Sequence, residues 1–331
     1  MLNVDIEERY TEAAWAALDY FPIKAESLGL VSHSENVTFR VSPRSGGLDY
    51  VLRLHRPGYC SIEELESERV WVSALKETGV TVQESVETLE GGHFALVDIP
   101  GSNEQCYVGM TTWHEGEPLR DYLVTCSDGV KRAQLLRRFG EIAAAFHNQS
   151  TGWSVPSGFV RRRLDQDALL GEAPFWGRFW EHPELTAEEQ SLLRRAKEWG
   201  RDVLSDYGDK HDNFSLIHAD FTPDNIIYDG NNLAIIDFDD AAFGWHAYDL
   251  ASVLVECQFD DDYAALEAAL LEGYRTHRSM EPRDIDMLPS FKLIRGMAII
   301  GWFYQRPEHA GSAYFERFKT WVLDACVRRR I

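Results

Sequence analysis

Apolar positions in the first 112 residues mostly follow the short spacing of strands, interrupted by two stretches with helical spacing. Residues 5–20 and 61–76 have apolar positions at helical spacing, and the second stretch begins with Ser61 and Glu64, the spacing of a capping box. Strand-like runs cover residues 36–41, 50–54, 80–86, 94–99 and 106–112. This part of the chain therefore predicts a small antiparallel sheet with one main inserted helix.

The spacing of apolar positions lengthens after residue 112, which indicates helices. Residues 113–118 are polar, contain Gly116 and Pro118, and are interpreted as a linker. One hairpin is expected beyond it, with strands at 225–228 and 233–236. Helices are expected at residues 132–148, 186–204, 248–257, 263–278, 288–304 and 314–329. The pattern predicts an α+β fold with domains at 1–112 and 113–331.

Composition and charge narrow the classes of protein. The 331 residues are 44% hydrophobic and 26% charged, which is ordinary for a globular chain. The formal net charge of −21 disfavours nucleic-acid binding and suits a cationic partner, although a solubilising acidic surface explains the charge equally well. Five widely spaced cysteines form no C-x-x-C pair, so no zinc site or disulfide framework is predicted. Without a signal peptide or an apolar run of membrane-spanning length, we expect a cytoplasmic protein that binds no membrane.

Three oxygen-bearing side chains follow one another at fixed spacings in residues 216–240. Asp220 precedes Asn225 by five positions, and Asp237 follows Asn225 by twelve, at the end of the expected hairpin. Because a hairpin folds back on itself, we expect Asn225 and Asp237 to lie side by side. Hard oxygen ligands hold Mg²⁺ against nucleotide phosphates, and a carboxylate accepts the proton of the attacking hydroxyl. We interpret Asn225 and Asp237 as metal ligands and Asp220 as the base.

The same residues carry a family resemblance. The pattern His218-Ala-Asp220, Asn225 and Asp237-Phe-Asp239 resembles the catalytic and metal-binding loops of protein kinases, with Ala219 and Asp239 in place of Arg and Gly. Together with the run from Trp245 to Ala251, these departures resemble the aminoglycoside phosphotransferase and choline kinase superfamily. Its homoserine kinase type II, hydroxylysine kinase and stress-response kinase branches are the most similar.

The resemblance implies a bilobal protein-kinase-like fold that uses ATP and Mg²⁺. Residues 1–112 would form the nucleotide-binding lobe, and residues 113–331 the helical catalytic and acceptor-binding lobe. Arg53 occupies the position of the family's phosphate-binding lysine, and Glu68 would be its helix partner. Asp249 would brace the catalytic loop. The other implied nucleotide contacts are Ser34 and Asn36 in a covering loop, and Thr112 and Trp113 at the hinge.

The acceptor is expected to be a small molecule with a hydroxyl and an amine. Residues 220–262 contain eleven Asp or Glu and no Lys or Arg, and Asp239, Asp240 and Glu256 are candidates for facing an ammonium group. Arg295 and Trp302 lie on a late helix that resembles the family's acceptor-side helices. The alternatives are a protein Ser/Thr kinase of the stress-response type, an inactive nucleotide-binding pseudokinase and, least supported, a metal-dependent hydrolase. A monomer or homodimer is expected.

Overall fold

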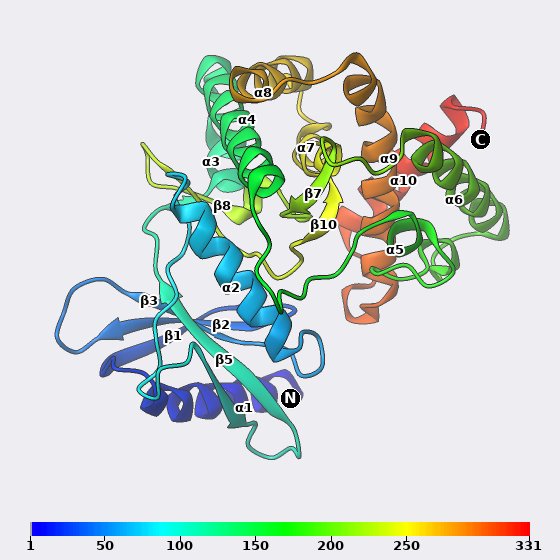
Figure 1. Cartoon of the computed structure of the whole chain (residues 1–331). Helices are drawn as coiled ribbons and strands as arrows, with labels where there is room; N and C mark the ends of the chain where they lie inside the picture. Colours follow the sequence, from blue (N-terminus) through cyan, green and yellow to red (C-terminus); the bar gives the residue numbers. More distant parts are fainter. Residues whose placement is uncertain (1) are drawn as a thin grey trace. The chain divides into compact units, whose positions relative to one another are not determined.

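A computed structural model describes residues 2–331 (Figure 1). The chain divides into two compact units. Unit 1 contains Met1–Pro118, Val155–Val160 and Ile226–Asp239, and unit 2 contains Leu119–Ser154, Arg161–Asn225 and Asp240–Ile331. Unit 1 thus includes the hairpin that follows Asn225, whereas the domain boundary predicted at residue 112 places this hairpin in the second domain.

Unit 1 is built on a five-stranded antiparallel sheet in the order β1-β2-β3-β5-β4. A second, three-stranded sheet in the order β6-β8-β9 contains the predicted hairpin. The strands are β1 (Ala25–His33), β2 (Val37–Pro43), β3 (Tyr50–Leu54), β4 (Phe94–Asp98), β5 (Gln105–Thr112), β6 (Glu117–Pro118), β8 (Ile226–Tyr228) and β9 (Leu233–Ile235). The helices are α1 (Leu2–Ala17), the 3-10 turn η1 (Leu18–Tyr20) and α2 (Ile62–Lys76).

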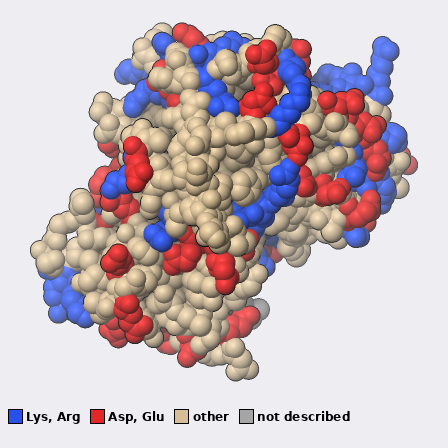
Figure 2. All heavy atoms as spheres, in the orientation of Figure 1, with Lys and Arg blue, Asp and Glu red and all other residues tan. Residues whose placement is uncertain are grey.

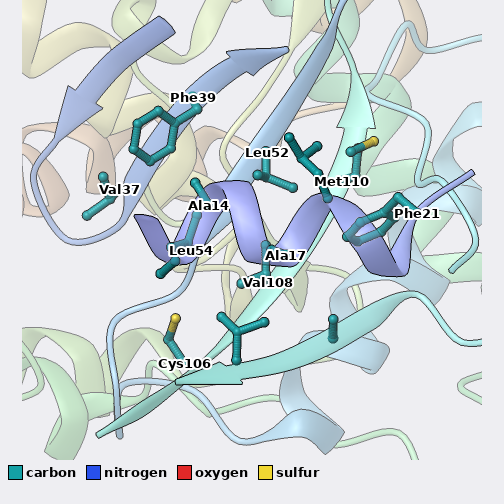
Figure 3. Close-up of a cluster of buried hydrophobic side chains, with 14 of the residues drawn as sticks. Ala14, Ala17, Phe21, Val37, Phe39, Leu52, Leu54, Cys106, Val108 and Met110 are labelled. Carbon is teal, nitrogen blue, oxygen red and sulfur yellow. The ribbon is translucent and has the colours of Figure 1, made fainter. Parts of the chain in front are cut away.

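The core of unit 1 forms where α1 packs against the five-stranded sheet (Figure 3). Alternate residues of β2 are buried, as expected for a strand with one covered face. Small side chains on α1 allow the helix to lie close to the strands, and Phe21 closes the end of the cluster. The residues in the cluster include Ala14, Ala17, Val37, Phe39, Leu52, Leu54, Val108 and Met110.

Most predicted elements of unit 1 are confirmed, with two exceptions. Helix α2 begins after Ser61, whose side chain and that of Glu64 form the predicted capping box. The strand predicted at 80–86 is wrong, because this segment makes only isolated bridges through Val82 and Ser85. Strand β1 was not predicted, and its side chains are mostly exposed.

Unit 2 is mostly helical and contains one two-stranded antiparallel pair, β7 and β10. All six predicted helices are present. The α-helices are α3 (Leu119–Thr125), α4 (Gly129–Gly152), α5 (Gln166–Leu170), α6 (Ala187–Tyr207), α7 (His246–Cys257), α8 (Tyr263–His277), α9 (Pro282–Tyr304) and α10 (Ala313–Arg328). The 3-10 turns are η2 (Phe179–Glu181), η3 (Pro223–Asn225) and η4 (Pro307–His309), and the strands are β7 (Phe214–Ile217) and β10 (Ala242–Trp245).

Helices α4 and α8 pack closely because each contributes a glycine at the crossing. A Cβ at Gly140 would lie 2.0 Å from the carbonyl oxygen of Leu270, and one at Gly273 would lie 1.8 Å from that of Arg137. Neither distance is compatible with a side chain. This packing supports α4, whose His147 contributes to the polar network described below.

Charged side chains of both signs are interspersed on the face shown in Figure 2, without one dominant patch. Within residues 2–331, no helix combines the length and apolar character needed to cross a bilayer.

Candidate functional site

The loop between β7 and β8 holds Asp220 and Asn225 in a compact arrangement. The side-chain nitrogen Nδ2 of Asn225 donates to the backbone oxygen and to Oδ2 of Asp220, both at 2.8 Å. The backbone turns tightly between them, since Thr222 N–H donates to the Asp220 carbonyl at 2.9 Å and Asn225 N–H to the Thr222 carbonyl at 3.0 Å. These bonds orient the Asn225 amide so that its oxygen Oδ1 is the atom suited to coordinating a cation.

The other oxygen of Asp220 pairs with a cation from α9. Arg295 donates from Nη2 to Oδ1 of Asp220, while the Asp220 side chain stays 34% exposed. Each carboxylate oxygen has two lone pairs, so both oxygens can still accept a further hydrogen bond. Asp220 is therefore a fixed, partly accessible carboxylate, which is what a base acting on a small hydroxyl requires.

Asp249 on α7 braces the start of this loop, as predicted. Its carboxylate accepts hydrogen bonds from the backbone N–H groups of His218 at 2.9 Å and Ala219 at 2.8 Å. Ala219 has a φ of 67°, a left-handed conformation that is unfavourable for a residue with a side chain. Asp249 is fully buried, and burial raises its pKa to about 6 against the opposing effects of His218 and the two N–H groups.

A buried polar network continues from Asp249 toward α8. His147 Nε2 lies 3.3 Å from Asp249, and its Nδ1 lies 2.8 Å from the hydroxyl of Tyr274. The rings of His147 and His246 stack with centroids 4.3 Å apart, and His246 contacts the hydroxyl of Ser215 at 2.7 Å. Burial lowers the pKa of both histidines well below the usual value, with Arg278 and, for His246, the neighbouring His147 adding to the effect.

These buried histidines predict that acid destabilises the fold. A histidine whose pKa is lowered by folding stabilises the protein above its unfolded pKa of about 6.5, and this contribution is lost as the pH falls. Burial also lowers the pKa of His55 to about 4, so these three most buried histidines act in the same direction. The lowered pKa values of His93 and His182 add to the effect, while the raised pKa values of Asp249 and Glu256 oppose it. We expect the unfolding free energy to fall by up to about 3 kcal/mol per pH unit between about pH 6 and 5.

Chemical denaturation at pH 7 and 5.5 measures this effect. His246→Asn should reduce the pH dependence by about one proton, whereas His277→Asn, which changes an exposed side chain, should leave it unchanged. An unfolding free energy that is equal at the two pH values would contradict the prediction.

In unit 1, Asp237 follows β9 and faces Arg53 of β3. Asp237 has a φ of 64°, and its Oδ1 lies 2.9 Å from Nη1 of Arg53. The same nitrogen lies 3.2 Å from Asp239. Burial tends to lower the pKa of Arg53, but Asp237, Asp239 and Glu68 outweigh it, so the net shift is upward. Arg53 is therefore a permanent cation held by the carboxylates of the Asp-Phe-Asp segment.

Asp239 also holds the turn between β1 and β2. Asn36 donates from Nδ2 to Asp239, while its Oδ1 accepts from the backbone N–H of Arg56 at 3.1 Å. Ser34 is exposed in this turn, and its N–H donates to the Asn36 carbonyl at 3.1 Å. The expectation that Asp239 faces the acceptor is wrong, because this buried carboxylate is engaged by Asn36 and Arg53 within unit 1.

The remaining predicted nucleotide contacts lie at the end of β5 and on α2. The backbone N–H of Thr112 donates to the carbonyl of Glu84 at 2.9 Å, and that of Trp113 to the carbonyl of Asp49 at 3.0 Å. Both hinge N–H groups are thus engaged within unit 1. Glu68 lies on α2 and is close enough to Arg53 to raise its pKa.

Glu256, another candidate for facing the acceptor, is buried in an ion-pair network of unit 2. Arg120 contacts Glu256 at 2.6 Å and Asp224 at 2.7 Å, and the hydroxyl of Tyr314 donates to Glu256. Burial raises the pKa of Glu256, against the effect of Arg120. These bonds join α3, α7 and α10, and the side chain of Glu256 is only 4% exposed, so it is much less accessible to an ammonium group than Asp220.

The predicted site residues thus fall into two groups. Asp220 and Asn225 meet in unit 2, and Ser34, Asn36, Arg53, Glu68, Thr112, Trp113 and Asp237 belong to unit 1. The convergence of Asp220 and Asn225 with Asp237 remains a prediction. Among the residues that the structure describes, no group of three or more His, Cys, Asp or Glu is arranged to hold a metal ion. The expected metal site differs from such a group because it includes the amide of Asn225.

Two contacts of the candidate site residues were not predicted from the sequence. Arg53 was expected to pair with Glu68 alone, although Asp239 after Asp237-Phe offered a further acceptor. Arg295 was placed on an acceptor-side helix without a link to Asp220. The available signal was a lone arginine in the apolar run from residue 293 to 300.

Solved structures similar to this one include kinases named for small-molecule substrates. A solved structure of a microcompartment-associated aminopropanol kinase is 29% identical, covers 96% of this chain and 94% of its own, and has a TM-score of 0.79. An amicoumacin kinase solved with AMP-PNP, Ca²⁺ and Ami is 17% identical, covers 97% and 95%, and has a TM-score of 0.77, which supports the fold. The predicted bilobal kinase-like fold class is confirmed.

The sequence comparisons agree with the structural ones. A homoserine kinase of Rhizobium rhizogenes is 31% identical over 172 residues. The matched segment covers 50% of this chain and 50% of that relative, so the chain spans about half of the relative's length. The phosphotransferase enzyme family (APH) matches residues 28–283. The predicted resemblance and the prediction of a kinase are confirmed at the level of this family. With most of its length matched, the chain belongs to the phosphotransferase enzyme family.

Proposed function

We propose that this enzyme transfers the γ-phosphoryl group of ATP to a hydroxyl of a small, amine-bearing acceptor, with Asp220 as the base and Mg²⁺ as the metal. The observation that carries the proposal is the carboxylate of Asp220, which is held at both oxygens by Asn225 and Arg295 and remains partly exposed. A positioned base of this kind contributes about 10²- to 10⁴-fold to the rate.

Phosphoryl transfer requires one group that accepts the hydroxyl proton and positive charges that neutralise the phosphates. The acceptor's hydroxyl oxygen would form a bond to the γ-phosphorus as the bond to the bridging β–γ oxygen breaks, and ADP would leave. Asp220 would take the hydroxyl proton and release it to water after transfer. Asn225 and Asp237 would hold Mg²⁺, which neutralises developing phosphate charge when bound.

The residues of unit 1 would bind the nucleotide. Arg53 would contact the phosphates, which requires its guanidinium to turn partly away from Asp237, while Asp239 keeps it in place. Glu68 would support Arg53 electrostatically. The turn containing Ser34 and Asn36 would cover the nucleotide. Thr112 and Trp113 would contact adenine through backbone carbonyls, since their N–H groups are engaged.

The acceptor class follows from chemistry and from the relatives. Residues 220–262 contain eleven Asp or Glu and no Lys or Arg, and this excess of negative charge along the segment that contains Asp220 favours an ammonium group. Aminopropanol and homoserine, named for two relatives, each combine an amine and a hydroxyl. A cytoplasmic location and a monomeric or homodimeric state remain part of the proposal.

An acceptor screen tests the proposed function. The enzyme is incubated with ATP and Mg²⁺, and ADP release is measured with amino alcohols, amino acids, aminoglycosides and neutral sugars in turn. We expect ADP release to depend on an amine-bearing alcohol and to stop when EDTA removes the metal. Nucleotide binding without any acceptor-dependent turnover would favour an inactive nucleotide-binding protein, and phosphorylation of a protein alone would favour the protein kinase alternative.

Removing the charge of Arg53 is expected to impair use of the nucleotide. Arg53→Met leaves Asp237 and Asp239 without their shared cation, so we expect kcat/KM for ATP to fall by about 10²-fold or more, with Arg53→Lys retaining more activity. Arg44→Met is the matched control, because Arg44 is exposed after β2 and belongs to no proposed nucleotide contact. Kinetics of Arg53→Met as close to the wild type as those of Arg44→Met would rule out a role of Arg53 in nucleotide binding.

A further inference from the structure

Arg295 is a buried cation in an otherwise apolar part of α9. The residues from Leu293 to Ile300 are all buried, and Arg295 is the charged member of this run. Burying a guanidinium is unfavourable unless a partner compensates it. Apolar side chains would fill this position at lower cost, so the pairing of Arg295 calls for a functional explanation.

The partner of Arg295 is the proposed base. Its Nη2 donates to Oδ1 of Asp220, and the guanidinium lies 5.6 Å from the ring centroid of Trp176. The ring of Trp176 stacks parallel on that of Tyr248, with centroids 6.1 Å apart. Burial raises the pKa of Tyr248, so its hydroxyl stays neutral near neutral pH. Arg295 also lies close enough to Asp249 and Glu256 to oppose the upward pKa shift of each, but its ion pair is with Asp220.

The two partners differ in exposure. The side chain of Arg295 is 10% exposed and that of Asp220 is 34% exposed, so the cation lies in the interior and the carboxylate reaches toward solvent. Arg295 approaches one carboxylate oxygen from α9, while Asn225 holds the other from η3. Two donors from separate elements fix the rotation of the carboxylate, and a fixed group needs little reorganisation during the reaction.

We propose that Arg295 is a positioning residue for Asp220, acting on the rate of phosphoryl transfer through the orientation of the base. The proposal rests on the proposed function of Asp220. It predicts that loss of Arg295 lowers kcat while the acceptor and the nucleotide still bind.

A double-mutant cycle tests this role. The cycle compares four variants with the wild type: Arg295→Met, Arg295→Lys, Asp220→Asn and the double variant Asp220→Asn/Arg295→Met. For each protein we measure kcat, the KM for the best amine-bearing alcohol, the KM for ATP and the thermal shift caused by ATP and Mg²⁺. Lys292→Met is the matched control, because Lys292 lies on the same helix, also sits over an aromatic ring, at 4.3 Å from that of Tyr263, and belongs to no part of the proposed site.

We expect Arg295→Met to lower kcat by about 10- to 100-fold, while the KM values for the acceptor and for ATP stay within about threefold of the wild type. The kcat of Arg295→Lys should fall between those of Arg295→Met and the wild type. Lys292→Met should match the wild type. In the Asp220→Asn background, removing Arg295 should change the residual rate by less than about twofold, since its target is gone.

Two results would overturn the inference: an unchanged kcat, whether or not the acceptor KM rises, or an equal loss of rate in the Asp220→Asn background. Failure of both Arg295 variants to fold while Lys292→Met folds would assign Arg295 to stability instead and equally reject the inference. Wild-type turnover in Asp220→Asn alone would instead refute the proposed base, so the two failures are distinguishable.

Discussion

Replacing Asp220 with alanine is expected to lower kcat by about 10²- to 10⁴-fold, the range for loss of a positioned general base. Asp220 is the carboxylate that Asn225 and Arg295 orient toward the accessible side of the loop. Steady-state kinetics with the best acceptor, and the thermal shift produced by ATP and Mg²⁺, measure the effect. Nucleotide binding should persist, because Asp220 is assigned to the acceptor and not to the nucleotide.

The control for this variant is an acidic residue in the same unit without a role in the site. Asp209→Ala removes a half-exposed carboxylate that pairs with Arg163 and should leave turnover within about twofold of the wild type, as is usual for surface ion pairs. If Asp220→Ala retains more than about a tenth of the wild-type kcat, the base must be another group.

Local signals made much of the fold predictable. The capping box at Ser61 and Glu64 lies within one helical turn, and the strands of the β8–β9 hairpin are separated by a turn that contains Asp229 and Gly230. The interactions that define such elements lie between near neighbours in the sequence. Residue types at short spacing were therefore enough to locate them.

Elements that depend on distant partners were harder to predict. Strand β1 is an edge strand with mostly exposed side chains, so it shows little apolar alternation and is defined by its pairing with β2. The segment at 80–86 reads as a strand, yet its backbone contacts include Ile235, far along the chain, and no continuous ladder forms. Apolar runs alone do not distinguish these two cases.

The contacts of the candidate site also divide into local ones, which were predictable, and distant ones, which were not. The spacing of Asp220 and Asn225 predicted their proximity, because both belong to one short loop. Arg295 lies 75 positions after Asp220, and only packing of α9 brings it there. Asp239 faces Arg53 and Asn36 because of strand pairing in unit 1, and the spacing of residues within the 237–240 segment could not predict these contacts.

The second large effect is expected from Asp249→Ala, which removes the brace of the loop that contains the proposed base. The change leaves the buried N–H groups of His218 and Ala219 without their acceptor, and each such group costs about 1–3 kcal/mol. Ala219 also loses the contact that holds its left-handed conformation. We expect the unfolding free energy at pH 7 to fall by about 3–5 kcal/mol, as measured by chemical denaturation.

A fall in kcat should accompany the loss of stability even where the protein remains folded. Asp220 directly follows Ala219, so a relaxed backbone would move this proposed base away from the position that Asn225 and Arg295 define. Asp249→Asn keeps one acceptor oxygen and should be less destabilising than Asp249→Ala, while Asp286→Ala, at an exposed position of α9, should change neither stability nor rate. If Asp249→Ala unfolds at the same denaturant concentration as Asp286→Ala, the loop is held by other contacts, and the backbone strain at Ala219 must be compensated elsewhere.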